Sequence, residues 1–72
     1  MQQQAKKYLQ GIGSKIRKAR DNKGISQQEL ADNADIAKST IQRIEKGTLN
    51  PSILTLNSLS VALKIDLKDL LP

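Results

Sequence analysis

Apolar residues recur along most of this chain at intervals of three or four positions, which is the spacing of one face of an α-helix. Ile12, Ile16 and Ala19 form the first such stripe. The stripe predicts a helix over about residues 11–23. Gly24 follows directly and ends it.

Two short helices joined by a tight turn come next. Ser26 has the position of an N-cap, and Glu29 three residues later completes a capping box. This helix holds about two turns, and its apolar face consists of Leu30, Ala31 and Ala34. The stretch AKSTIQRIEKG, residues 37–47, predicts the next helix, with Gly47 as its left-handed C-cap. The apolar side of that helix consists of Ile41 and Ile44.

Two further helices complete the pattern after the loop GTLNPS. Ser52 caps a helix whose apolar positions are Ile53, Leu56, Leu59, Ala62 and Leu63. Asp66 caps a last turn that contains Leu67, Leu70 and Leu71. The chain is therefore predicted to be all-α, with five helices and no strand. We expect residues 11–72 to form one domain and residues 1–10 an extension, either flexible or continuing the first helix.

The composition limits what such a domain can do. A chain of 72 residues buries one modest core, here built from aliphatic side chains because Phe and Trp are absent. Cys and His are absent too, which removes disulfides, the usual zinc sites and most acid–base or nucleophilic catalysis. No apolar run is long enough for a membrane span. We expect a cytoplasmic protein that is not an enzyme, binds no cofactor or metal and does not contact a membrane.

Positive charge is concentrated in two segments. The formal net charge is +5, which is typical of proteins with an acidic partner. Residues 1–23 carry seven Lys or Arg against one Asp, and residues 37–47 carry three against one Glu. Between them, residues 24–36 carry three acidic side chains and no basic one. This distribution directs attention to the helix at residues 37–47.

The motif SQQELADNADIAKSTIQRIEKGTLNPS, residues 26–52, resembles the helix-turn-helix of the phage Cro and repressor (XRE-type) family. Members typically have a Gln-x-Glu-Leu-Ala opening, a tight turn, a recognition helix containing Ser-Thr-Ile, then Ile-Glu-x-Gly and Asn-Pro-Ser. The matching residues here are Gln27, Glu29, Leu30, Ala31, Ser39, Thr40, Ile41, Ile44, Glu45, Gly47, Asn50, Pro51 and Ser52. The resemblance extends from about Ile12 to Leu71. It implies a compact, five-helix, lambda-repressor-like DNA-binding domain with its helix-turn-helix at the second and third helices.

Two positions depart from the family pattern. Asp35 stands where the family usually has Gly in the turn, and Asp tolerates a left-handed backbone better than most residues. Ala37 stands where a Ser or Thr cap is common, so the third helix lacks a side-chain cap that is worth about 1 kcal/mol.

The polar side of the third helix has two interpretations. It is either an ordinary solvated helix surface or the part of the protein that contacts DNA bases. In a helix-turn-helix the residues opposite the buried stripe face the major groove, and the resemblance favours this second interpretation. The predicted base-reading residues are Lys38, Ser39, Gln42 and Arg43. Arg43 can contact guanine through two hydrogen bonds, and Gln42 offers a donor and an acceptor to adenine.

Other residues are predicted to position the domain. The resemblance implies phosphate contacts from Gln27, and the next candidates for that role are Lys46, Thr48 and Asn50. Lys15 and Lys18 either attract DNA at long range or only improve solubility. The family often pairs an Arg of the first helix with the Glu that is here Glu45, so we expect Arg20 and Glu45 to form a structural clamp, with a phosphate contact as a second role for Arg20.

The expected partner is double-stranded DNA carrying an inverted-repeat operator, bound by a homodimer, because one short helix contacts only a few base pairs. The predicted dimer surface consists of Leu67, Leu70 and Leu71 with the end of the fourth helix, the alternative being that the leucines all close the monomer core. The leading function is a transcriptional regulator, either a repressor or a restriction-modification controller. The alternative is an antitoxin-type module that binds a protein partner and represses its own operon.

Overall fold

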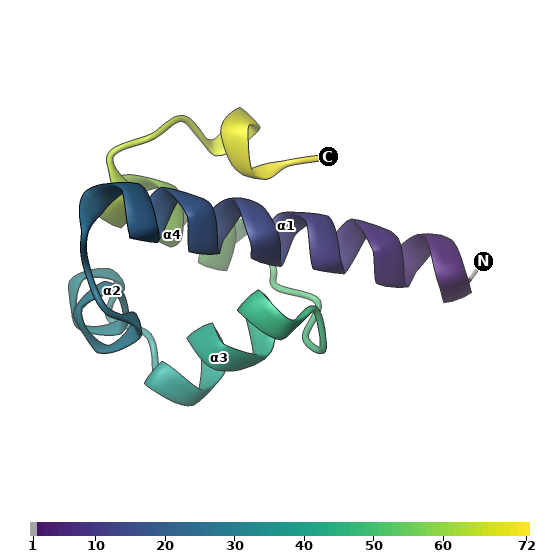
Figure 1. The fold of residues 1–72 in the computed structure, drawn as a ribbon, viewed down its shortest axis with the longest axis horizontal. Helices are drawn as coiled ribbons and strands as arrows, with labels where there is room; N and C mark the ends of the chain where they lie inside the picture. Colours follow the sequence, from purple (N-terminus) through teal and green to yellow (C-terminus); the bar gives the residue numbers. More distant parts are fainter. Residues whose placement is uncertain (1) are drawn as a thin grey trace.

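The computed structural model describes residues 2–72, with side chains described from residue 4. The described part of the chain is all-helical. Its α-helices are α1 (Gln2–Lys23), α2 (Gln27–Ala34), α3 (Lys38–Lys46) and α4 (Ile53–Leu63), and a 3₁₀ turn, η1 (Leu67–Leu70), follows. In Figure 1, α1 runs the length of the molecule, α2 and α3 lie on one side of it, and the C-terminal segment returns along the other.

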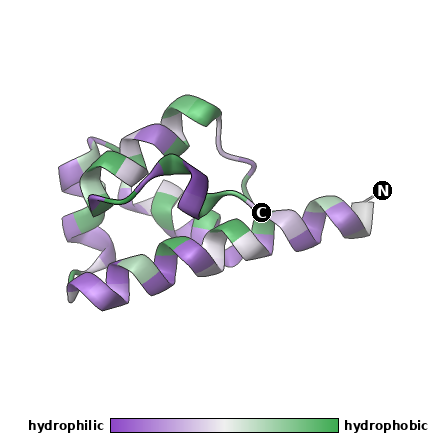
Figure 2. Cartoon of the chain, turned by 90° about the horizontal axis from the view of Figure 1, so that it is seen from above, coloured by the Kyte–Doolittle hydropathy of each residue, from purple (hydrophilic) through white to green (hydrophobic). Residues whose placement is uncertain are grey.

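Two boundaries differ from the sequence prediction. The first helix begins at Gln2 and not near Gly11, so residues 2–10 follow the predicted alternative in which the extension continues this helix. The Gln, Ala, Lys and Leu residues there favour helix, and no capping residue interrupts them. Figure 2 shows these first turns projecting beyond the rest of the chain. The predicted fifth helix is wrong as an α-helix. Residues 67–70 can form only a single helical turn. This turn is of the 3₁₀ type, with a hydrogen bond of 3.0 Å from the Asp69 amide to the Asp66 carbonyl.

One aliphatic core joins all of these elements. Its largest fully buried side chains are Ile16, Leu30, Ile41, Ile44, Leu59, Leu63 and Leu70. The burial of Leu70 removes this residue from the predicted dimer surface. η1 turns back onto α1 and α4, so Leu70 closes the monomer core and Leu67 and Leu71 pack partly against it. The Lys15 ammonium donates to the Leu71 carbonyl at 2.7 Å, which holds the C-terminus against α1.

Most of the large apolar side chains that are exposed in the described part of the chain lie on α4, and Tyr8 of α1 is exposed as well, at 53%. Leu54 is 76% exposed, Val61 68% and Ile53 58%, and all three belong to α4. No residue of α4 is charged. In the described part of the chain, no helix is both long and apolar enough to cross a membrane.

Candidate nucleic-acid interface

The turn between α2 and α3 sets their crossing. Asp35 ends α2 in the left-handed conformation, with φ 55° and ψ 48°, which an Asp side chain tolerates at modest cost. The Ile36 amide then donates to the Ala31 carbonyl at 2.9 Å. Ala31 is 1% exposed and belongs to the same core cluster as Ile41 and Ile44 of α3, where its small side chain leaves room for close helix packing. At the start of α2, Ser26 and Glu29 form the complete capping box.

The turn leaves one side of α3 facing solvent. Ile41 and Ile44 are buried, and the side chains predicted to read bases are all exposed: Lys38, Ser39, Gln42 and Arg43. Ala37 provides no side-chain cap hydrogen bond to the first amides of α3. The structure therefore brings the four base-reading candidates together on one accessible helix surface.

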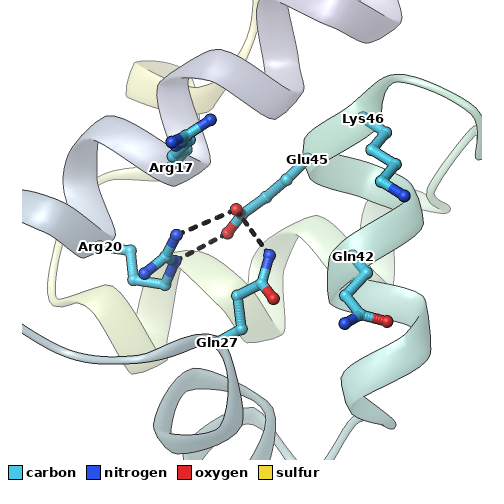
Figure 3. A pocket seen from close by; sticks show the side chains of 6 residues that line it. All are labelled: Arg17, Arg20, Gln27, Gln42, Glu45 and Lys46. Carbon is cyan, nitrogen blue, oxygen red and sulfur yellow. Dashed lines mark hydrogen bonds and ion pairs between the residues drawn. The ribbon is translucent and has the colours of Figure 1, made fainter.

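Arg20, Glu45 and Gln27 form a hydrogen-bonded cluster behind that surface (Figure 3). The Arg20 guanidinium donates from Nε to Glu45 Oε2 at 2.9 Å and from Nη2 to Glu45 Oε1 at 3.1 Å. A third donor, Nη1, bonds the Ile25 carbonyl at 3.0 Å. The side chains of Arg20 and Glu45 are only 13% and 5% exposed. This bidentate pair ties α1 to α3.

The hydrogen bond to Glu45 raises the pKa of Arg20 above its usual value, although burial acts in the opposite direction. The guanidinium is thus charged at every ordinary working pH. Because the pKa of Arg20 is higher in the folded state than in the unfolded state, this ionisation stabilises the fold fully at any pH below the unfolded-state pKa. That stabilisation is lost only in strongly alkaline solution. Acidification of the sample will not remove charge from Arg20.

The predicted phosphate contacts divide into two groups. Lys46 and Asn50 are exposed and reach solvent next to α3. Gln27 and Thr48 are already engaged within the protein. Gln27 Nε2 donates to Glu45 Oε1 at 3.1 Å, and the Thr48 hydroxyl donates to the Arg43 carbonyl at 3.1 Å, where it closes the end of α3. The link between Gln27 and Glu45, which lie 18 positions apart, had no local signal in the sequence.

A cavity of about 330 Å³, called here the α1–α3 cavity, opens beside this cluster. The residues that line it are Arg17, Arg20, Gln27, Gln42, Glu45 and Lys46. Arg17 was not among the predicted functional residues. The available signal was its position, four residues after Gly13 and three before Arg20, which places all three on one face of α1.

The helix-turn-helix family model matches residues 16–70. The chain belongs to the helix-turn-helix family. One curated relative is the transcriptional regulator SinR of Bacillus subtilis, which is 41% identical to this chain over 61 residues. The matched residues cover 83% of this chain and 55% of SinR. The chain thus spans about half the length of that relative.

Solved structures of relatives share the fold. The restriction-modification controller C.AhdI from Aeromonas hydrophila has a TM-score of 0.84 at 32% identity, covering 86% of this chain and 94% of that chain. A SinR structure in complex with DNA has a TM-score of 0.79 at 40% identity, covering 82% and 95%. A SinR–SinI protein complex matches with a TM-score of 0.79 at 40% identity, covering 82% and 58%. The compact helix-turn-helix fold predicted for this family is confirmed.

Proposed function

We propose that this chain is a sequence-specific transcriptional regulator that binds double-stranded DNA and reads the major groove with α3. The exposed polar side of α3 carries the proposal, because it lies opposite the buried Ile41 and Ile44 in a helix-turn-helix. The fold shared with DNA-bound SinR and with a restriction-modification controller supports it.

The four exposed side chains have the chemistry that base recognition needs. Arg43 can donate two hydrogen bonds to guanine, and Gln42 can exchange a donor and an acceptor with adenine. Lys38 reaches guanine or a phosphate, and the Ser39 hydroxyl serves either role. Phosphate contacts from Lys46 and Asn50 set the depth and register of α3, while Thr48 supports them by closing the helix end.

Selection of bound sites from a random DNA library tests this function. We expect enriched inverted repeats, with half-site centres about one helical turn apart. Affinity for an enriched site should then fall steeply with salt, with a logarithmic slope of about 0.9 per phosphate contact. No enrichment, together with a slope near zero on any DNA, would exclude the function.

Arg43→Ala should weaken the binding free energy for the selected operator by about 1–3 kcal/mol, because a base contact is lost. Binding to random DNA should change little. Lys46→Ala is the matched control, since it removes another exposed cation of α3 and should weaken both DNAs by similar factors. Binding titrations on both DNAs measure the contrast, and circular dichroism verifies the fold. An unchanged operator preference in folded Arg43→Ala would remove Arg43 from the base-reading set.

We infer that the active form is a homodimer whose surface is the exposed apolar side of α4. One reading helix gives a small interface that competes poorly against nonspecific DNA, and a two-fold copy doubles the contacts. Leu54 and Val61 are separated by two helical turns and so lie on one side of α4. Since α4 carries no charged residue, two copies can meet there without burying an unpaired charge.

Leu54→Glu should therefore convert the protein to a monomer and weaken operator binding by a factor of at least ten, because two carboxylates would meet in an apolar contact. Asn22→Glu adds the same charge to an exposed position of α1 and should leave the dimer intact. Light scattering gives the mass of each variant. A wild-type protein that remains monomeric on its operator contradicts the inferred dimer.

Control by a protein partner is the second candidate function, and the SinR–SinI complex favours it. A partner that covered the exposed side of α3 would block its contact with DNA and so release the operator. Adding the purified product of the neighbouring gene to the operator complex tests the idea, with release of the DNA as the expected result.

A further inference from the structure

The α1–α3 cavity has the chemistry of an anion site. Three of its lining side chains are cationic and one is a carboxylate, giving a net charge of +2. The cavity is open to solvent, and its volume of about 330 Å³ far exceeds the roughly 10–15 Å³ that one water requires by the same measure. The cavity can therefore hold a phosphate group together with part of its hydration shell.

The carboxylate in this cavity is already neutralised. Both oxygens of Glu45 accept hydrogen bonds from Arg20, and Oε1 also accepts one from Gln27. The Glu45 side chain is only 5% exposed, so its negative charge is balanced by Arg20 inside the protein and has little effect on a ligand. Arg20 is likewise committed to Glu45. The charge left for a ligand belongs to the remaining two cations, Arg17 and Lys46.

Arg17 and Lys46 come from different helices and lie on opposite sides of the opening in Figure 3. Both residues are exposed, and neither forms an ion pair within the described part of the chain. Gln27 and Gln42 also line the cavity and lie below both cations in the view of Figure 3. An anion seated there meets one cation from α1, one from α3 and two side-chain amides.

We propose that the α1–α3 cavity seats one backbone phosphate of the bound DNA, with Arg17 as a direct phosphate ligand opposite Lys46. The proposal rests on the DNA-binding function above and adds a residue and a geometry to it. The guanidinium of Arg17 presents a planar set of donors that matches two phosphate oxygens. Gln27 retains a second amide hydrogen beyond the one given to Glu45 and can donate it to the same phosphate.

A backbone phosphate fits better than a base edge. Base recognition needs unoccupied donors and acceptors, and the one carboxylate in the α1–α3 cavity is filled by Arg20 and Gln27. Gln42 both lines the cavity and belongs to the exposed side of α3. A phosphate held by Arg17 and Lys46 therefore lies directly beside the bases that α3 reads, and it fixes α1 and α3 to one strand.

Arg17→Gln tests the proposal against Lys18→Gln, which removes the next cation of α1 from an exposed position outside the cavity. We expect Arg17→Gln to weaken binding roughly tenfold on both operator and random DNA and to reduce the salt slope by about 0.9, the value for one contact. Lys18→Gln should change the slope by much less. Arg17→Lys, which retains the charge, should retain most of the slope. Equal effects of Arg17→Gln and Lys18→Gln would overturn the proposal.

Neutral methylphosphonate substitutions, placed one at a time along the operator backbone, locate the contact. At one position per half-site the neutral substitution should weaken the wild type more than it weakens Arg17→Gln, because Lys46 and Gln27 still contact that phosphate in the variant; this non-additivity is the coupling expected for a direct partner. Additive losses at every position would contradict a phosphate seat at Arg17. A wild type that binds no DNA would instead reject the proposed function, so the two failures are distinguishable.

Inorganic phosphate separates a DNA site from a site for a free anion. A cavity that holds a phosphate of a DNA strand should bind inorganic phosphate only in the millimolar range. At micromolar concentrations, phosphate should therefore displace DNA no better than chloride does at equal ionic strength. Chemical shifts of the Arg17 side chain report the titration. Micromolar binding of inorganic phosphate that competes with DNA would overturn the proposal and assign the cavity to a free anion.

Discussion

Gly13→Ala is expected to destabilise the domain by about 2–3 kcal/mol, because α1 and α3 meet there backbone to backbone. A Cβ at Gly13 would lie 2.7 Å from the Glu45 carbonyl oxygen and closer still to that of Ile44. Neither partner is the end of a flexible side chain, so one helix has to move as a whole. The midpoint of thermal unfolding should fall by roughly 8–20 °C in a domain of this size.

Gly11→Ala is the matched control. Gly11 is also within α1, and a Cβ built on it meets nothing within 4 Å. The same substitution there should stabilise the protein by about 0.5–1 kcal/mol, since alanine loses less backbone entropy in a helix. Thermal and urea unfolding followed by circular dichroism compare the two variants. If both variants gain stability, the close approach of α1 and α3 is wrong.

Local signals in the sequence were enough to predict the helix-turn-helix. The hydrogen bonds of the capping box at Ser26 and Glu29 and of the C-cap at Gly47 join residues that are close in the sequence. Such features can therefore be predicted from neighbouring residues alone. The exposed side of α3 followed from the spacing of Ile41 and Ile44 alone.

Features that depend on contacts between distant residues were not predicted. The burial of Leu70 arises because η1 returns to α1 and α4, and a row of leucines is compatible with either a core or an interface. Arg17 lines the α1–α3 cavity because α1 packs against α3, and the sequence does not specify that packing locally. Gly13 shows the same limit, since its sequence neighbours do not reveal the carbonyls it contacts.

Glu45→Ala should cost about 3 kcal/mol, because it leaves a nearly buried guanidinium without its bidentate partner. The carboxylate accepts two hydrogen bonds from Arg20 and one from Gln27, and water cannot fully replace them where Arg20 is 13% exposed. The loss should extend to operator binding, since α3 is no longer tied to α1. Urea unfolding and binding titrations measure the two effects.

Asp21→Ala provides the matched control for this clamp. Asp21 also faces Arg20, at 3.6 Å, but its side chain is 59% exposed, so its removal should cost no more than about 1 kcal/mol. Replacing both members of the buried pair, Arg20→Met with Glu45→Leu, should destabilise less than Glu45→Ala alone, because no unpaired charge remains. If the double variant is more stable than Glu45→Ala, the stability lost in Glu45→Ala comes from leaving the Arg20 guanidinium buried without a partner. Equal losses from Asp21→Ala and Glu45→Ala would show that the pair is solvated and does not hold α3 in place.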